Sequence, residues 1–321
     1  MSNSDDGNAE MMPIIDEPRR NKKRKEPYAK RLARFITDKK IRRKAKVLQK
    51  LNLAAGIVHL LSGVALVIVA IIFRDDAVRT ELTTDFKVFS ESFTGPATAG
   101  QLELQSKSLG FYPVVWVDIP FPFITAAFHL VLALSQTYRN RYNAYVFAEG
   151  RNPYRWREYA ITASLMTWVI CQLSGITNIF LLIMIAVVAN IALQFTGEWM
   201  ERTNHDLFGL RKRAKHIDWV PTAVGWIIFL GQWSTILTYF FTAISSPRPE
   251  GVEQVPVFVY LIVIGLFFQF AVFGFTLFIR FYYQCNSSLN KAYNSEIMFI
   301  LLSFTSKLFL TWTLQIGTIM Q

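Results

Sequence analysis

The sequence predicts an all-α membrane protein: a bundle of seven transmembrane helices with the N-terminus in the cytoplasm and a small extracellular β-hairpin in the first loop. Hydrophobic residues make up 52 % of the 321 residues, and charged residues only 18 %. The apolar residues come in blocks of about 17 to 25 residues that carry almost no charge. A helix of that length crosses a hydrocarbon core of about 30 Å.

Seven such blocks define the expected spans: 51–73, 122–138, 153–176, 179–197, 220–244, 257–283 and 297–320. The second is the shortest, and its start depends on whether residues 119–123 lie in the helix or in the interface. Only residues 177 and 178 separate the third span from the fourth, so we expect these two helices to be antiparallel neighbours. The chain opens on a polar, charged stretch instead of a signal peptide, so the first span is expected to act as its own insertion signal.

The distribution of Lys and Arg predicts the orientation. With the N-terminus inside, 28 of the 34 Lys and Arg face the cytoplasm, and 16 of these lie in residues 1–50. This asymmetry favours a multi-pass protein with a cytoplasmic N-terminus and an extracellular C-terminus. The net charge of +11 therefore reflects topology and attraction to anionic lipid headgroups, and we expect no nucleic-acid partner.

Residues 1–46 form the first of two expected domains. They are polar and basic without an apolar period, which predicts a largely disordered cytoplasmic arm, with residues 28–46 able to form an interfacial helix. The second domain, 47–321, holds the seven helices. In its first loop, alternating residues at 86–89 and 111–117 predict the hairpin. Cys171 and Cys285 fall in different places on this topology, so no disulfide is expected.

Catalytic and metal-binding patterns are missing from the sequence. It has no Gly-rich phosphate loop, no nucleophile elbow and no Cys/His spacing suited to zinc. No nucleophile, base and orienting group stand at recognisable spacing, so an enzyme is not expected.

Lys307 is a lone lysine in the middle of the last span. A lysine at the centre of a spanning helix costs about 2.5 to 3.5 kcal/mol. It follows Ser295 by about 18 Å of helix, which is too deep for the side chain to reach the interface. One interpretation is a structural lysine in a polar gap. The other is a reactive amine, because desolvation disfavours the charged form and a neutral amine condenses with an aldehyde to give a Schiff base.

A protonated Schiff base inside the bilayer needs a nearby anion. Glu158, in the third span, is the acidic residue nearest the right place. Side chains lean toward the helix N-terminus, which brings Lys307 closer to the level of Glu158. Ser303, one turn before the lysine, could donate to either group. In the alternative interpretation, Glu158 pairs with Arg155 or Arg157 at the rim.

These segments resemble a known family. Asn152-Pro-Tyr-Arg-Trp-Arg-Glu-Tyr159, Ser164-Leu-Met166 and Ser303-Phe-Thr-Ser-Lys307, with the basic N-terminus and the long first loop, resemble the heliorhodopsins, the inverted-topology branch of the microbial rhodopsins. The resemblance spans about residues 47–320, and the basic arm has no counterpart. It implies that residues 47–321 are a retinal-binding domain.

The resemblance implies a role for each matching residue. Lys307 would bind all-trans retinal as a protonated Schiff base, with Glu158 as its counterion and Ser303 as a hydrogen-bond partner. The retinal pocket would be lined by Met166, Asn190, Trp233, Phe268 and Gln269. A cytoplasmic polar cavity or proton path would contain His59, His129, Arg155, Tyr159, Glu201 and Trp312. Taken alone, each histidine is more often a core residue. Glu198 is an additional acid near Glu201.

The resemblance favours a light sensor that signals without pumping ions. One alternative is a light-activated proton transporter or channel that uses the histidines and acids on the cytoplasmic side. The far side offers mainly Gln172 and Thr177, which argues against a pump. Another alternative is a seven-helix receptor without retinal. The expected partners are the lipid bilayer and an unknown cytoplasmic signalling protein. The resemblance also implies a homodimer, in which the first extracellular loop is expected to form part of the contact.

Overall fold

The computed structural model describes residues 37–73, 78–89, 102–204, 217–247, 255–282 and 289–319. Residues 1–36, which form most of the expected arm, and Cys285 lie outside these ranges. Within them the chain is mostly helical, with one small sheet. The elements, in chain order, are α2 Lys39–Ile72, β1 Arg79–Phe89, β2 Leu102–Pro113, α3 Val115–Asp118, α4 Pro120–Leu134, α5 Gln136–Asn143, the π-helical η2 Ala144–Glu149, α6 Pro153–Leu173, α7 Ile179–Leu182, the π-helical η3 Ile183–Ala189, α8 Asn190–Thr203, α9 Val220–Ser245, α10 Val257–Tyr282 and α11 Leu289–Ile319.

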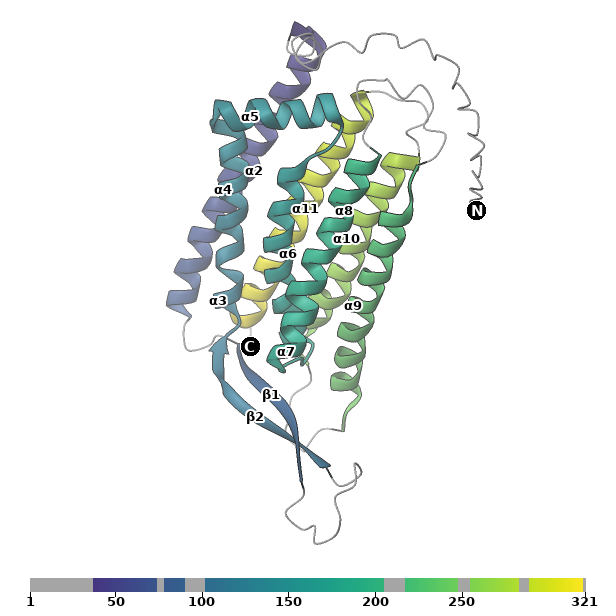
Figure 1. Ribbon diagram of the computed structural model, residues 1–321. Helices are drawn as coiled ribbons and strands as arrows, with labels where there is room; N and C mark the ends of the chain where they lie inside the picture. The colour runs from purple at the N-terminus through teal and green to yellow at the C-terminus, as the bar shows by residue number, and fades with distance from the viewer. Residues whose placement is uncertain are drawn as a thin grey trace, which may run out of the picture.

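The long helices stand side by side and form a bundle with two distinct ends (Figure 1). We call the end that carries β1 and β2 the hairpin end, and the end crossed by α5 the α5 end. Helix α2 begins at the α5 end, and α11 finishes at the hairpin end. The described ends of the bundle therefore lie on opposite sides.

Six helical segments of the described chain are long and apolar enough to cross a membrane: α2, α3 with α4, α7 with η3 and α8, α9, α10 and α11. Helix α6 runs among them but is not one of the six. Its first two turns carry Arg155, Arg157 and Glu158, which lower its hydropathy. The six other expected spans are confirmed as apolar helices, and the side of the membrane that each end faces stays a prediction.

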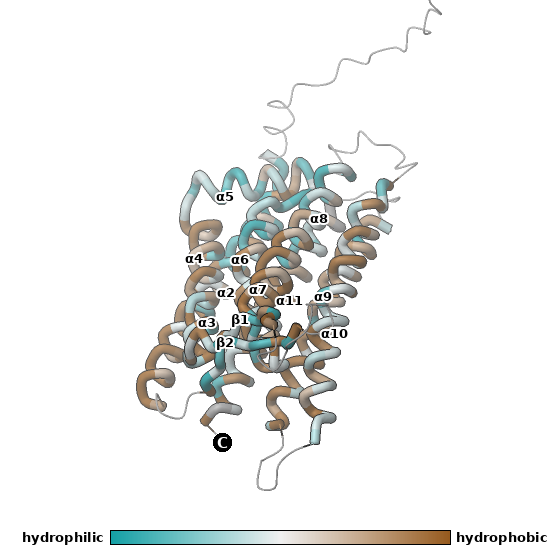
Figure 2. Tube along the Cα trace, turned by 60° about the horizontal axis from the view of Figure 1, so that its bottom comes forward, coloured by the Kyte–Doolittle hydropathy of each residue, from teal (hydrophilic) through white to brown (hydrophobic). Residues whose placement is uncertain are grey.

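Apolar side chains cover the outer walls of the bundle. Leu61, Ile71 and Ile227 are each more than 60 % exposed, whereas many polar side chains are buried inside. Figure 2 shows the hydrophobic colour along most of the long helices and the hydrophilic colour on α5. Such an apolar surface is stable against lipid and not against water. The chain is an integral, multi-pass membrane protein.

Helix α2 begins earlier than the expected span at residue 51. The Asp38 side chain caps it, accepting from the backbone N of Lys40 at 2.7 Å and of Ile41 at 3.4 Å. Ile41 and Leu48 are buried in a cluster with Tyr142 of α5. Residues 39–46, assigned to the arm from sequence, are therefore part of the first long helix, because this cluster buries the apolar face of the helix there.

The second span is displaced toward the N-terminus relative to its prediction of 122–138. It starts in α3 at Val115, and Ile119 between α3 and α4 keeps a helical backbone. Pro120 suits the first turn of α4 because it needs no amide partner there. The span ends at Leu134, and the polar residues that follow form α5 as a separate helix across the bundle. The shift brings Asp118 inside the span.

The predicted hairpin is confirmed as a two-stranded antiparallel sheet that pairs Arg79 with Pro113 and Phe89 with Leu102. A register shift follows Leu82, where Gly110 takes a positive φ of 128°. The predicted second strand extended to 117, but the chain turns into α3 after Pro113. The hairpin stays close to the bundle because Thr83 N donates to the carbonyl of Thr177 at 2.9 Å.

Tyr112 at the end of β2 attaches the hairpin to α6. Its hydroxyl donates to Gln172 Oε1 and accepts from Trp168 Nε1, both at 2.7 Å. Burial raises the pKa of the Tyr112 phenol, and the hydrogen bond from Trp168 partly opposes this. The neutral phenol is therefore the form that holds the two elements together.

The fourth span is interrupted by the π-helical segment η3. A π-helix bonds residue i to i+5 and so accommodates one extra residue in its turn. Gln232 of α9 donates from Nε2 to the carbonyl of Ile185 at 2.8 Å. A carbonyl without a partner is costly at membrane depth, and the Gln232 amide satisfies this one.

Candidate functional site

Lys307 of α11 lies in the bundle interior with 3 % of its surface exposed. Its Nζ forms an ion pair with Glu158 Oε1 of α6 and donates to Thr125 Oγ1 of α4 at 2.8 Å. The amine also lies 5.4 Å from the centre of the Tyr159 ring. Three helices that are distant in sequence thus meet at one nitrogen.

The ion pair has a simple physical cause. A buried ammonium or carboxylate alone costs several kcal/mol, and pairing with hydrogen bonds offsets that cost. Glu158 stands in the second turn of α6, on the face that buries Arg155, Thr162 and Met166. The structure places its carboxylate against Lys307, not against Arg155 or Arg157. Thr125 was missed because a lone threonine in an apolar span usually bonds to its own helix.

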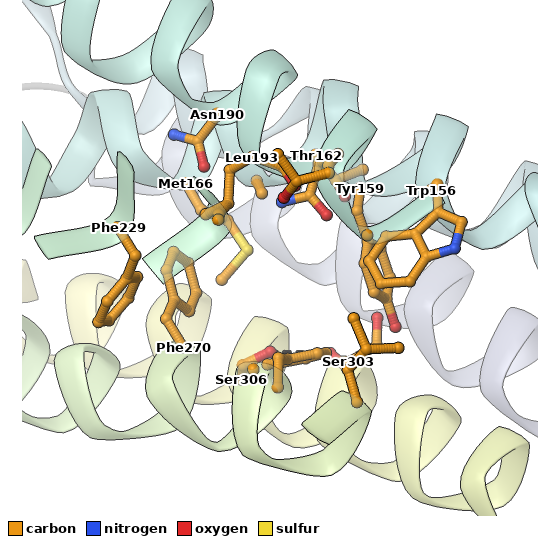
Figure 3. Close-up of a pocket in the computed structure, with 18 of the residues that line it drawn as sticks. Trp156, Tyr159, Thr162, Met166, Asn190, Leu193, Phe229, Phe270, Ser303 and Ser306 are labelled. Atoms are coloured by element: carbon orange, nitrogen blue, oxygen red, sulfur yellow. Dashed lines mark hydrogen bonds between the residues drawn. The ribbon is translucent and has the colours of Figure 1, made fainter. Parts of the chain in front are cut away.

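A large cavity extends from Lys307 between α6, α8, α9, α10 and α11. It encloses about 890 Å³ of empty space, a volume that includes its opening to the outside. Figure 3 shows Met166, Leu193, Phe229 and Phe270 around it, with Ser303 and Ser306 of α11 on the opposite side. The aromatic side chains of its wall are Trp156, Tyr159, Trp226, Phe229, Phe270 and Phe273. The cavity is suited to an elongated apolar ligand whose one polar end meets Lys307.

Small residues set the shape of this wall. A Cβ on Gly225 would lie 2.7 Å from Thr196 Oγ1, and one on Gly274 would lie 3.0 Å from the Trp226 ring. A Cβ on Gly197 would overlap Trp156 at 2.4 Å. Larger residues at these positions would therefore push wall side chains into the cavity.

A second polar cluster closes the α5 end of the interior. Arg155 Nη1 bonds Glu296 Oε2 at 2.5 Å, and the guanidinium groups of Arg155 and Arg280 both contact Glu201. Trp156 Nε1 also donates to Glu201, at 2.7 Å. Two arginines and two glutamates balance their charges there, with all four side chains buried to at least about nine-tenths.

A smaller cavity of about 330 Å³ separates this cluster from Lys307. Its walls include Asn52, His129, Glu158, Tyr159 and Glu296. Polar groups thus continue from the Lys307 amine toward the α5 end.

The comparison with known families decides the identity. The model of the family described as Heliorhodopsin matches residues 48–319. The chain belongs to the heliorhodopsin family. No curated protein matches it.

Rhodopsins bind retinal, and the heliorhodopsin site of this chain fits that ligand. Lys307 supplies the amine at one end of an apolar, aromatic cavity, and Glu158 supplies an anion in contact with it. The family match begins at Leu48, so the whole basic arm, residues 1–46, lies outside it. The predicted family is confirmed.

Two of the expected pocket residues of this heliorhodopsin line the cavity, namely Met166 and Asn190. Trp233 lies one layer behind, with its ring 6.1 Å from Phe229 and 5.8 Å from Phe270. Gln269 is not part of the cavity wall.

The prediction that Phe268 lines the retinal pocket needs correction, because its side chain is 61 % exposed on the outer wall of the bundle. Helix α10 instead turns Phe270, Phe273, Gly274 and Leu277 inward, at the i, i+3, i+4, i+7 spacing of one helix face. Phe268, two residues before Phe270, points away from this face. Because α10 is apolar on all sides, its sequence did not show which face is internal.

The expected histidines form one group in the heliorhodopsin interior. The rings of His59 and His129 are stacked, with centres 6.2 Å apart, and His129 Nδ1 bonds Asn52 Oδ1 at 2.7 Å. Arg155, Tyr159 and Glu201 lie near this group, and their part in a cytoplasmic proton path stays a prediction.

Three details of the polar prediction differ. The prediction that Trp312 belongs to the polar cavity needs correction. Trp312 follows Lys307 toward the hairpin end, away from the cavity that Glu296 lines. Ser303 lines the large cavity, but the Lys307 amine bonds Thr125 instead. Glu198 pairs with Arg202 at 2.5 Å near the surface and stands apart from the cavity.

Besides Thr125, three charged residues of the interior were missed. Glu296 and Arg280 lie at the ends of apolar blocks, where charges are usual, so they gave no signal beyond their sign. Asp118 was assigned to the first loop, but it is fully buried in the second span on the hairpin side of Lys307. The sequence-based view that this side offers mainly Gln172 and Thr177 is therefore incomplete.

Proposed function

We propose that this heliorhodopsin is a light sensor that holds all-trans retinal on Lys307, with Glu158 as counterion. The observation that carries the proposal is the contact between Lys307 and Glu158 at the end of the aromatic cavity. Bound retinal supplies a polyene that absorbs visible light and isomerises, joined to Lys307 as a protonated Schiff base. The residues of the chain provide the remaining parts of the mechanism.

Two residues control the charge and direction of the lysine nitrogen. Glu158 balances a positive charge there, and Thr125 accepts a hydrogen bond from the free amine and so fixes the direction of the side chain. Burial lowers the local dielectric, which strengthens both interactions. Movement of this nitrogen relative to Glu158 changes the electrostatic energy between α6 and α11, and this change would drive the helices to a new arrangement.

The cluster of Arg155, Glu201, Glu296 and Arg280 supports a signalling output. It joins α6, α8, α10 and α11 near the α5 end, so a shift of α6 against α11 reaches the surface where a signalling protein would bind. This surface is cytoplasmic in the predicted orientation. The proposal includes no enzymatic activity.

Light-activated proton movement is the second candidate. The stacked pair of His59 and His129 on one side of Lys307 and Asp118 on the other favour it. Voltage-clamped cells that express the full chain distinguish the two functions. A light-dependent current would support proton movement, and a normal photocycle without current would support the sensor.

The chromophore test uses the full chain purified with all-trans retinal. We expect a visible absorption band that Lys307→Ala abolishes and that Glu158→Gln shifts to longer wavelength. Lys87→Ala, which changes an exposed lysine of β1, is the matched control and should keep the band. A band that survives Lys307→Ala would refute the proposal, and extraction of the bound retinal would identify its isomer.

We also propose a homodimer that forms through the hairpin. Phe89, Leu104 and Phe111 of the two strands are each more than 60 % exposed. Exposed aromatic and aliphatic side chains of this size are typical of interaction surfaces. Replacing all three with serine should convert the dimer to a monomer in light scattering while the visible band remains, and an unchanged mass would exclude this surface.

A further inference from the structure

Asp118 has a buried carboxyl group that takes no part in the proposed light-sensing mechanism. It is the last residue of α3, has 0 % of its surface exposed and lies within the span Val115–Leu134. Neither carboxyl oxygen has a hydrogen-bond partner among the described residues. A buried polar group without a partner costs about 1 to 3 kcal/mol, so packing alone does not explain the residue.

Asp118 and Lys307 belong to the same polar region of the bundle interior. Thr125, which bonds the Lys307 amine, follows Asp118 by almost two helical turns and therefore lies on the same face of the span. The axial distance between the two residues is about 10 Å at about 1.5 Å per residue. Asp118 thus lies on the hairpin side of the amine, opposite to the histidine pair.

Thr311 connects Asp118 to the helix of Lys307. It follows Lys307 by one turn on α11, so both side chains lie on one face. Thr311 is 1 % exposed, and its side chain lies near the Asp118 carboxyl, although neither group has a hydrogen-bond partner among the described residues. A shift of the Lys307 side chain along α11 would therefore alter the surroundings of the Asp118 carboxyl.

No described cation is available to Asp118. The elements that pack against α3 are α4, α6 and α11. Their buried charged groups already pair with one another or with Glu201. The charged groups are Arg155, Glu158, Glu296 and Lys307, and the titratable groups are His129, Tyr159 and Cys171. An unpaired buried carboxylate costs several kcal/mol, and a carboxyl in that position keeps its proton instead.

We propose that Asp118 is a second proton-binding site, which holds its proton in the resting protein and is coupled to Lys307 through Thr311. The binding of the proton concerns the chain alone, whereas the coupling rests on the proposed light-sensing function. The protein then has titratable groups on both sides of the lysine nitrogen.

Infrared spectroscopy of the full chain in lipid vesicles, without retinal and near neutral pH in heavy water, tests the proton site. The wild type should show the carbonyl band of a protonated carboxyl. Asp118→Asn should remove it, and Asp118→Glu should shift it. Asn has the shape of the neutral acid, so the fold should persist. Asp85→Asn, at an exposed position of β1, is the matched control and should keep the band. Identical spectra for wild type and Asp118→Asn would overturn the site.

Light-minus-dark infrared spectra of the retinal-loaded protein test the coupling. We expect the Asp118 band to shift in the light, and Thr311→Val to change the size of that shift. A visible band that responds to light while the Asp118 band stays fixed would overturn the coupling and leave the proposed function intact. If no visible band forms, the proposed function fails, whereas the retinal-free spectra still decide whether Asp118 holds a proton.

Discussion

The hydroxyl of Thr125 accepts a hydrogen bond from the amine of Lys307 at 2.8 Å. This contact joins α4 to α11 at the level of the Glu158 carboxylate. It gives the second span a direct part in the chemistry of the lysine, a part that the family resemblance did not assign to it.

Replacing Thr125 tests that contact. A hydrogen bond to a charged group contributes about 1.5 to 3 kcal/mol. We expect Thr125→Val to lower the melting temperature by several degrees and to shift the visible band. Thr125→Ser keeps the hydroxyl and should have little effect on either. Equal behaviour of the two variants would show that the hydroxyl does not matter.

The Glu201 cluster should be a large contributor to stability. Glu201→Gln leaves the guanidinium groups of Arg155 and Arg280 with Glu296 as the one remaining carboxylate of the cluster. Breaking a buried ion pair by removing one partner costs about 3 to 5 kcal/mol. Thermal unfolding in detergent should show a clear drop in melting temperature.

Glu198→Gln is the control for that experiment. Glu198 is itself buried, but its partner Arg202 is 59 % exposed, so solvent screens the pair and we expect it to contribute about 1 kcal/mol. A loss of stability at Glu198 equal to the loss at Glu201 would contradict the importance assigned to the buried cluster.

Gly225 should control the uptake of retinal. A Val at this position places its Cβ against Thr196 and narrows the cavity. Overpacking costs about 1 to 3 kcal/mol, which corresponds to an affinity loss of roughly fivefold to a hundredfold. Retinal titration followed by visible absorption measures it. Gly231→Val on the same helix has open space around its Cβ and should bind normally. Normal binding by Gly225→Val would mean that the ligand avoids this part of the cavity.

The hairpin should separate from α6 at high pH. The pKa of the Tyr112 phenol is raised above its ordinary value of 10.0, so the folded state binds this proton more tightly than the unfolded state does. The stabilisation is therefore complete below about pH 10 and is lost as the pH rises through the folded-state value. Melting temperatures measured against pH should fall more steeply for the wild type than for Tyr112→Phe in that range. Parallel curves would contradict the prediction.

The sequence predicted the bundle because the cost of burying charge in lipid leaves long uncharged blocks. The cost of burying charge also made the Lys307 site predictable. A lysine in the middle of a span requires an anion nearby, and Glu158 was the candidate within reach. Glu296 and Asp118 were missed because charges at the ends of apolar blocks are expected to face water. In the structure α11 starts before its apolar block and α3 before the predicted span, so both carboxyls lie inside.

The pocket wall was the least predictable part. On a helix that is apolar all round, such as α10, lipid and ligand select the same kinds of side chain. Phe268 and Phe270 are the same residue type two positions apart, yet only Phe270 faces the cavity. Which of them does so depends on how the helix packs against α9 and α11, and the local sequence does not encode that rotation. The histidine pair was predicted from the family resemblance and not from the local sequence, because each histidine taken alone is more often a core residue.

The π-helical turn at Ile183–Ala189 makes the length of the fourth span adjustable at one place. It stores one surplus residue, so a deletion within it should produce an ordinary α-turn and leave Asn190, Gln194 and Glu201 facing inward. A deletion further along α8 would rotate everything beyond it by about 100° and carry Glu201 away from its arginines. Insertions and deletions among heliorhodopsin relatives should therefore be tolerated in this turn and rejected in the rest of the helix.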